Sequence, residues 1–258
     1  MSAYLSVAGF TKLYPSPRGN VLALDGIDLE VGQGEFVSIL GPSGCGKSTL
    51  IKCIAGIETG TGGEIRLGGA LLDGPPHGLG VVFQRDILLD WRTILQNVMI
   101  TAEFMRLDLA ASEREALRLL ELFGLAGFER HHPWELSGGM RQRAAICRAL
   151  VSDPQLLLMD EPFGALDAMT RDELNIELQR IWLQFRKTVV FVTHSIQEAV
   201  FLSDRVVVMS RNPGRVIEDL TIDVPRPRPL AVRATPDFNR YVTQLQALFR
   251  RVGVFKGE

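Results

Sequence analysis

Short apolar runs that alternate with helical patterns fill the second half of the chain. The runs at residues 156–159, 189–192 and 206–209 contain only Leu, Val, Phe and Met, and each predicts a buried strand. Apolar residues at helical spacing lie between them and predict helices over 138–150 and from about 171 to 185. Because strands that alternate with helices form parallel sheets, we expect an α/β fold whose core has a mostly parallel sheet.

The first 84 residues instead combine short strands with glycine-rich turns. The pattern predicts strands at 4–11, 29–31, 36–40, 64–67 and 80–84. The strand at 36–40 leads into a glycine-rich loop and a helix, and the other strands surround this segment in the sequence. We expect those others to form a mostly antiparallel N-terminal β subdomain beside it.

A helical texture begins near Asp86 and continues to Trp134. Ser112 and Glu115 have the spacing of a capping box, which predicts a helix start, and Gly124 predicts the end of that helix. An inserted α-helical subdomain is the simplest interpretation.

The last part of the chain, residues 211–258, has its own composition. Residues 224–233 interleave Pro with Arg, which predicts an extended, exposed segment. Thr235-Pro236 then predicts a helix start, with apolar residues at helical spacing behind it. This extension is either a linker with a docked terminal helix or a contact for a partner or an anionic membrane surface.

Composition narrows the class of protein. The chain has 258 residues, 46% of them hydrophobic, which suits either one large α/β domain or a core with inserted subdomains. Its net charge of -2 gives no global reason to expect nucleic acid as a partner. No run approaches the roughly 18 apolar residues of a membrane span, and the start lacks a secretory signal, so we expect a cytosolic chain. Its three cysteines, Cys45, Cys53 and Cys147, show no metal-site spacing and predict free thiols.

A phosphate-binding loop follows the strand at 36–40. Its glycines allow the backbone N–H groups to turn inward as an anion site, Lys47 adds a charge at the outer phosphates, and Ser48 can ligate Mg²⁺. The helix that begins at Lys47 and ends before Gly56 directs its positive end at the phosphates. We expect nucleoside triphosphate contacts from Gly41, Pro42, Ser43, Gly44, Cys45, Gly46, Lys47, Ser48 and Thr49.

Cys45 and a pair of acids add chemistry to this loop. Cys45 lies near Lys47 and a helix amino end, a setting that favours thiolate, although an inert small residue in a turn is the equal alternative. The strand at 156–159 ends in Asp160 and Glu161. Neighbouring residues there point in different directions, so Asp160 can hold Mg²⁺ while Glu161 accepts a proton from an attacking water.

Leu136-Ser137-Gly138-Gly139-Met140, in this order with the motifs above, resembles the signature of the ATP-binding cassette (ABC) ATPases. The resemblance covers residues 1–210 and implies ATP and Mg²⁺ as cofactors. It implies that Gln84 senses Mg²⁺ and water, that His194 lies at the γ-phosphate, that Asp167 contacts the opposite subunit and that Tyr14 stacks on adenine.

The resemblance also implies a domain plan around a P-loop NTPase core. The nucleotide-binding domain is expected at 1–210, with a β subdomain at 1–84 interwoven with the phosphate-loop segment 35–56, a helical subdomain with the signature at 85–137, the rest of the core at 138–210, and the extension at 211–258.

Ser137, Gly138 and Gly139 precede a helix and therefore predict a second anion site. In the family two cassettes pair head to tail, so that each ATP lies between the loop of one and the signature of the other. The resemblance implies a second copy of the chain as partner, a separate integral membrane permease that contacts residues 85–97, an extracytoplasmic substrate-binding protein, and a place on the cytoplasmic face of the membrane.

Met140 departs from the glutamine common at the end of the signature. Methionine there is similar to importer ATPases for nitrate, sulfonate, taurine and related solutes. The alternative is a soluble ABC-type ATPase switch that acts on nucleic acid or ribosomes, although its usual second cassette, coiled coil or zinc cysteines are not evident here. A phosphotransferase would need an acceptor site, and Glu161 beside Asp160 favours water as the acceptor.

Overall fold

The computed structural model describes residues 3–17 and 19–251 and contains two sheets. The larger sheet has six strands in the order β10-β9-β3-β8-β7-β6, and the smaller has four in the order β2-β1-β4-β5. The larger sheet comprises β3 (Phe36–Leu40), β6 (Leu79–Val82), β7 (Leu156–Asp160), β8 (Thr188–Thr193), β9 (Arg205–Met209) and β10 (Val216–Thr221). Only β10, at its edge, pairs antiparallel, which confirms the mostly parallel core.

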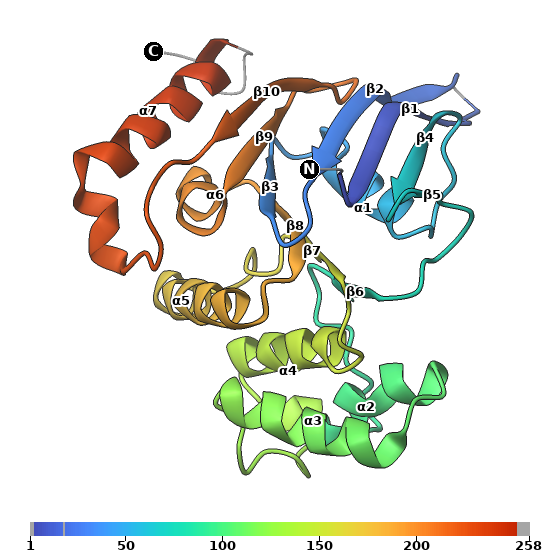
Figure 1. The fold of residues 1–258 in the computed structure, drawn as a ribbon, viewed down its shortest axis with the longest axis vertical. Coiled ribbons are helices and arrows are strands. Elements are labelled where there is room, and N and C mark those ends of the chain that lie inside the picture. The colour runs from blue at the N-terminus through green and yellow to red at the C-terminus, as the bar shows by residue number, and fades with distance from the viewer. Residues whose placement is uncertain (1–2, 18, 252–258) are drawn as a thin grey trace.

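The smaller sheet is antiparallel and lies beside helix α1 (Lys47–Ile54) (Figure 1). Its strands are β1 (Leu5–Tyr14), β2 (Val21–Val31), β4 (Gly62–Leu67) and β5 (Ala70–Leu71). The strand predicted at 80–84 is not part of it, because β6 pairs in parallel with β7 in the large sheet. That part of the prediction was wrong, since the partner of a short apolar strand is chosen by the whole fold and not by its neighbours in sequence.

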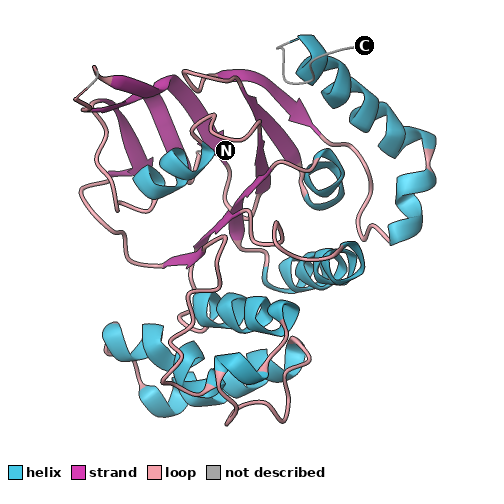
Figure 2. Cartoon of the chain, turned by 180° about the vertical axis from the view of Figure 1, so that it is seen from behind, coloured by secondary structure: helices cyan, strands magenta, loops and turns pink. Residues whose placement is uncertain are grey.

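The remaining helices cover the large sheet and extend below it (Figures 1 and 2). The inserted helical subdomain contains α2 (Ile94–Phe104), α3 (Leu109–Leu122), the 3₁₀ turn η1 (Pro133–Glu135) and the packed start of α4 (Gly138–Leu150). The others are α5 (Ala168–Phe185), α6 (Ile196–Leu202), the 3₁₀ turn η2 (Leu230–Ala234) and α7 (Pro236–Arg251).

Helix α3 begins earlier than its pattern suggested. The Asp108 carboxylate accepts from the N–H groups of Ala110 and Ala111 at 2.9 and 3.0 Å and is the N-cap. Ser112 is buried inside the helix, so the predicted capping box was wrong, while Gly124 does follow the helix end with φ 67°. Aspartate is as good an N-cap as serine, and the structure uses the one that adds a further turn.

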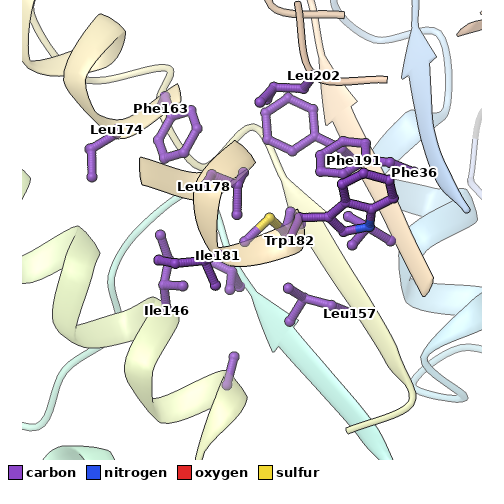
Figure 3. Close-up of a cluster of buried hydrophobic side chains, with 14 of the residues drawn as sticks. Phe36, Ile146, Leu157, Phe163, Leu174, Leu178, Ile181, Trp182, Phe191 and Leu202 are labelled. Carbon is purple, nitrogen blue, oxygen red and sulfur yellow. The ribbon is translucent and has the colours of Figure 1, made fainter. Parts of the chain in front are cut away.

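Aromatic and aliphatic side chains lock α5 onto the large sheet (Figure 3). Trp182 of α5 meets Phe36 of β3 edge to face at 5.9 Å between ring centroids, and Phe36 lies 5.9 Å from Phe191 of β8. Leu178 and other apolar residues of α5 are buried in the same cluster. This core fixes the carboxyl ends of the strands, from which the acidic and histidine side chains of the candidate site project.

The segment at 224–233 exposes its prolines, as its composition predicted, but turns Arg226 and Arg228 inward. Arg228 is only 2% exposed, and the Arg226 side chain is 9% exposed. The terminal helix is docked as predicted, because α7 buries Phe238, Tyr241 and Leu245. A segment rich in proline and arginine predicts an extended backbone. Its composition does not determine whether the arginine side chains are buried, because this depends on which carbonyl groups of other segments accept their hydrogen bonds.

Candidate functional site

The phosphate loop lies between β3 and α1 and wraps around the amino group of Lys47. Lys47 is 4% exposed, and its Nζ donates to the carbonyl oxygens of Gly41 at 2.9 Å and Pro42 at 3.1 Å. Gly46, the N-cap of α1, has φ 101°, and a Cβ there would lie 2.9 Å from the Ala23 carbonyl oxygen. Glycine is therefore needed for both the turn and the close approach of β2.

Glu161 connects Lys47 with His194. Its Oε1 lies 3.3 Å from Lys47 Nζ, and its Oε2 lies 3.1 Å from Nδ1 of His194, whose side chain is 52% exposed. Glu161 has a φ of 45°, in the left-handed region that non-glycine residues avoid, and its N–H donates to the Val192 carbonyl at 2.9 Å. Strained backbone conformations of this kind persist only where the surrounding structure fixes them, and they are found most often at functional sites.

Asp160 faces a different group from its neighbour. Ser48 Oγ donates to Asp160 Oδ1 at 3.0 Å. Burial raises the pKa of the Asp160 carboxyl, and the hydrogen bond from Ser48 offsets this in part. The two adjacent acids thus have different partners. Asp160 accepts a hydrogen bond from Ser48 of the loop, whereas Glu161 contacts Lys47 and His194.

A cavity of about 440 Å³ opens over the loop. Gln84 lies at this cavity with Ser48 and Glu161, so the loop, Gln84 and the acid that follows β7 come together in space although they are far apart in sequence. The complete lining is Val21, Leu22, Ala23, Ser43, Gly44, Gly46, Lys47, Ser48, Thr49, Gln84, Glu161 and Asn212.

The oxygen donors at this cavity suit Mg²⁺. A serine hydroxyl, an aspartate carboxylate and a glutamine amide oxygen are available from Ser48, Asp160 and Gln84, and Mg²⁺ prefers such ligands while retaining several waters. In the part of the chain that the structure describes, no group of three or more His, Cys, Asp or Glu residues could hold a metal. A site made of one carboxylate and neutral oxygens therefore fits a cation that also binds phosphate oxygens.

Asn212 and residues 21–23 are cavity residues that the sequence patterns missed. Asn212 lies in the turn between β9 and β10, and the next glycine, Gly214, donates to the Ala23 carbonyl at 3.0 Å. A Cβ on Gly214 would lie 2.2 Å from the Cys45 carbonyl oxygen, so this turn packs directly on the phosphate loop. The Asn-Pro-Gly sequence signals a turn, but nothing local indicates where the turn docks.

Cys45 does not have the reactive setting that the sequence suggested. Its side chain is 1% exposed, and burial raises the pKa of the thiol, with the attraction of Lys47 a smaller opposing effect. This burial favours the inert alternative. The cysteines Cys45, Cys53 and Cys147 are all buried free thiols, as predicted.

Tyr14 is not among the residues that line the cavity. Its hydroxyl donates to the Glu58 carboxylate, and Lys12 Nζ lies 4.7 Å from the centre of its ring. Burial, followed by the Glu58 hydrogen bond, raises the pKa of this hydroxyl. Tyr14 is half-buried, and its stacking on adenine stays a prediction.

The signature lies on α4, where the helical subdomain meets the sheet core (Figure 1). Ser137 is the N-cap of α4, and its Oγ accepts from the Met140 N–H at 3.3 Å. Ser137 and Gly138 are exposed, whereas Gly139 packs so closely on α5 that a Cβ would lie 2.6 Å from Thr170 Cγ2. The Met140 side chain packs against the core, so methionine here is a packing residue.

The structure does not bring the signature or Asp167 to the cavity over the phosphate loop. Asp167 is the exposed N-cap of α5, and hydrogen bonds led by that of the Thr170 hydroxyl lower the pKa of its carboxyl. One chain therefore contains a cavity over the phosphate loop and, outside the lining of that cavity, the exposed amino ends of α4 and α5.

The segment after Gln84 is tied to the signature helix. Arg141 Nε lies 2.9 Å from Asp86 Oδ2, and Arg148 donates to the carbonyl oxygens of Asp86 and Ile87 at 2.7 and 2.6 Å. Buried Asn97 accepts from the Leu89 N–H at 2.6 Å. Through these contacts, α4 connects the signature at its start with the cavity residue Gln84.

Comparisons with known proteins agree with this geometry. The ABC transporter family profile matches residues 24–164. An uncharacterized ABC transporter ATP-binding protein of Methanocaldococcus jannaschii is 48% identical over 228 residues, which are 88% of this chain and 85% of that protein. The taurine import ATP-binding protein TauB of Yersinia pestis is 46% identical over 201 residues, 78% of this chain and 79% of TauB.

Two further matches extend the comparison. The bicarbonate transport ATP-binding protein CmpC of Synechococcus elongatus is 46% identical over 232 residues, which are 88% of this chain but 35% of CmpC. Among solved structures, a dimeric ATP-binding cassette in a post-hydrolysis state with ADP and Pi bound matches with a TM-score of 0.76 and 31% identity, covering 86% of this chain and 100% of that one. With the profile, the relatives and the fold in agreement, the chain belongs to the ATP-binding, ATP-hydrolysing proteins of the ABC transporter family.

Proposed function

We propose that this chain is the ATP-hydrolysing subunit of a membrane importer, which pairs with a second copy around two MgATP and drives a separate permease. The observation that carries the proposal is the separation of two sites. Lys47 and Glu161 line one cavity, with His194 in contact with Glu161, whereas the exposed Ser137 and Gly138 of the signature do not line that cavity. A second copy placed head to tail would bring the signature of one chain to the cavity of the other. The dimeric cassette with ADP and Pi supports this arrangement.

Each side chain has a role in hydrolysis under this proposal. The N–H groups of the loop and Lys47 bind the phosphates, and Glu161 accepts a proton from the attacking water, a contribution of roughly 10² to 10⁴ in rate. His194 holds the Glu161 carboxylate through its 3.1 Å contact. Ser48, Asp160 and Gln84 would hold Mg²⁺, which supplies charge neutralisation at the phosphate oxygens.

A permease would contact the segment that follows Gln84. Ile87 is 52% exposed and Trp91 is 75% exposed, and both lie on the segment that Arg148 and Asn97 fasten to the helical subdomain. Exposed apolar side chains on a fixed backbone suit the docking of a short helix. Among the described residues no helix is both long and apolar enough to span a bilayer, and we place the chain on the cytoplasmic face through its permease.

The cargo is proposed by likeness alone. TauB and CmpC are import or transport proteins for taurine and bicarbonate, and a small anion or organic solute such as nitrate, sulfonate or taurine fits the same group. A substrate-binding protein outside the membrane would select it. Growth and uptake assays on a deletion strain, with taurine, alkanesulfonates, nitrate and bicarbonate as cargo candidates, test this part.

Co-purification from detergent-solubilised membranes tests the coupling. We expect the tagged chain to bring down an integral membrane protein, and Trp91→Asp to weaken this capture while leaving basal ATP hydrolysis intact. Thr243→Asp, on the exposed face of α7, is the matched control. A chain that never enters a membrane complex but sediments with ribosomes or DNA would contradict the proposal and favour a soluble ATPase switch.

A further inference from the structure

Three arginines of the C-terminal extension, Arg226, Arg228 and Arg233, contact both helix α5 and the region of helix α6. We call them the arginine clasp. They lie between β10 and α7, in a segment outside the nucleotide-binding motifs. Two of them are among the least exposed charged side chains of the described chain, with Arg228 at 2% and the Arg226 side chain at 9%.

Arg228 caps the carboxyl end of α6. Its Nη1 donates to the carbonyl oxygens of Val200, Phe201 and Ser203 at 2.7, 3.0 and 2.9 Å. Its Nε and Nη2 donate to the Val224 carbonyl at 3.0 and 2.8 Å. The last carbonyls of a helix lack partners within it and carry its negative end, so a buried guanidinium satisfies them in both respects.

The Arg228 backbone is fixed to α5 at the same point. Its N–H donates to Gln179 Oε1 at 2.5 Å, and Gln179 Nε2 donates to its carbonyl at 2.8 Å. Burial lowers the pKa of Arg228 to about 10, which leaves the side chain charged at neutral pH. Arg228 therefore holds both helices at one place.

The other two arginines extend this link. Arg226 donates to the Leu202 carbonyl and, at 3.0 Å, to Asp204, while its guanidinium lies 4.3 Å from the ring centre of Trp182 in α5. Arg233 lies 2.7 Å from Asp172 of α5 and 5.3 Å from the Phe201 ring of α6.

The amino end of α6 is part of the hydrolytic site. The helix has seven residues, begins directly after His194 and Ser195, and is too short to be stable alone. Thr193 Oγ1 donates to Glu198 at 2.6 Å, and Glu198 lies 3.6 Å from Arg171 of α5. His194 lies two residues before α6 in the chain, so a displacement of this helix would carry over to His194 and change its contact with Glu161.

We infer that the arginine clasp is a positioning element for ATP hydrolysis, in which Arg228 fixes α6 and thereby the contact between His194 and Glu161. The inference rests on the proposed role of His194. No residue of the clasp lines the cavity over the phosphate loop, and we therefore expect the clasp to act on turnover and not on nucleotide binding.

Arg228→Gln in the full chain tests the inference, with Arg250→Gln on the exposed face of α7 as the matched control. We expect kcat to fall about 10-fold to 100-fold, in line with the cost of a small misplacement of catalytic groups. The dissociation constant of a fluorescent ATP analogue should change less than about twofold, and Arg228→Lys should retain part of the activity, because lysine keeps the charge but not the fork of donors. Amide exchange should rise in α6 and stay unchanged in α1.

A double-mutant cycle separates positioning from a general loss of structure. His194→Ala with Arg228→Gln should be no slower than His194→Ala alone, because Arg228 acts through His194. A folded Arg228→Gln chain with normal kcat would overturn the inference, as would additive losses in the cycle or a dissociation constant that rises as much as kcat falls.

Two further variants keep the test decisive. If Arg228→Gln does not fold, Arg233→Gln, whose side chain is 21% exposed, should give the same split between kcat and binding with a smaller factor, and normal turnover there would refute the inference. Normal turnover in His194→Ala would instead contradict the proposed function of that residue. A low kcat in His194→Ala together with a normal kcat in Arg228→Gln would support the proposed function and contradict only the positioning role of the arginine clasp.

Discussion

The phosphate loop at the start of α1 and the signature at the start of α4 are both helix amino ends, yet their surroundings differ. The loop lies against buried Lys47 and the acids Asp160 and Glu161, under a cavity. Ser137 and Gly138 of the signature are exposed and are not among the residues that line this cavity. We expect the loop to bind a triphosphate within one chain, and in the proposed pairing the signature would complement the site of a second copy.

The largest effect should come from the acid that carries the chemistry. Glu161→Gln removes the proton acceptor beside Lys47 and His194, and we expect kcat to fall by roughly 10² to 10⁴. ATP affinity should persist, and light scattering should detect a dimer that forms with MgATP and does not dissociate. Glu113→Gln on the exposed face of α3 is the control, and rapid turnover in Glu161→Gln would place the base elsewhere.

A change at the signature should act through the second copy. Ser137→Arg puts a bulky cation at the exposed start of α4, and we expect steady-state hydrolysis to drop by about 10² because one set of anion donors is blocked. ATP binding to the dilute monomer should not change, since Ser137 does not line the cavity. Thr243→Arg on α7 adds the same side chain away from both sites, and full hydrolysis in Ser137→Arg would mean that the signature takes no part.

Thermal unfolding without nucleotide should show opposite signs at the two sites. Burial raises the pKa of Asp160 in the folded chain, so its charged form costs stability above that pKa, and the cost disappears as the pH falls below the unfolded value near ~3.9. Asp160→Asn should raise Tm by about 1–3 °C at pH 7.5, and this gain should shrink as the pH falls toward the unfolded pKa. Ser137→Ala removes an N-cap worth ~1 kcal/mol and should lower Tm by about 2–4 °C.

A rise in Tm for Asp160→Asn and a fall for Ser137→Ala would show that the buried Asp160 carboxylate costs stability, whereas the Ser137 cap stabilises its helix. A fall in Tm for Asp160→Asn at pH 7.5 would mean that the Ser48 hydrogen bond outweighs the burial of the carboxylate.

The smallest change concerns Cys45. Because it is 1% exposed and burial raises the pKa of its thiol, we expect iodoacetamide to label it at least about 10-fold more slowly in the native chain than in denaturant. Peptide mass spectrometry gives the extent at each cysteine. Fast labelling that stops hydrolysis and is prevented by ATP would restore the reactive thiolate that the sequence alone allowed.

The sequence alone predicted those elements that depend on residues close together in the chain. The glycines and Lys47 of the phosphate loop define a turn and a helix start within a few residues, and Ser137 caps α4 within one turn. The apolar runs of β7, β8 and β9 are buried on both faces, so their composition alone predicts strands of a parallel sheet. The same apolar run predicted that Asp160 and Glu161 lie at the carboxyl end of β7.

Only the tertiary structure decided contacts between distant segments. It placed β6 in the large sheet, buried Cys45, and brought Asn212 and residues 21–23 to the nucleotide cavity. It also turned Arg228 of the Pro-Arg segment inward, where carbonyl oxygens at the carboxyl end of α6 accept its hydrogen bonds. Spacing along a chain encodes helix and strand periods, but the partner of a strand edge or a guanidinium group depends on which surfaces meet after folding.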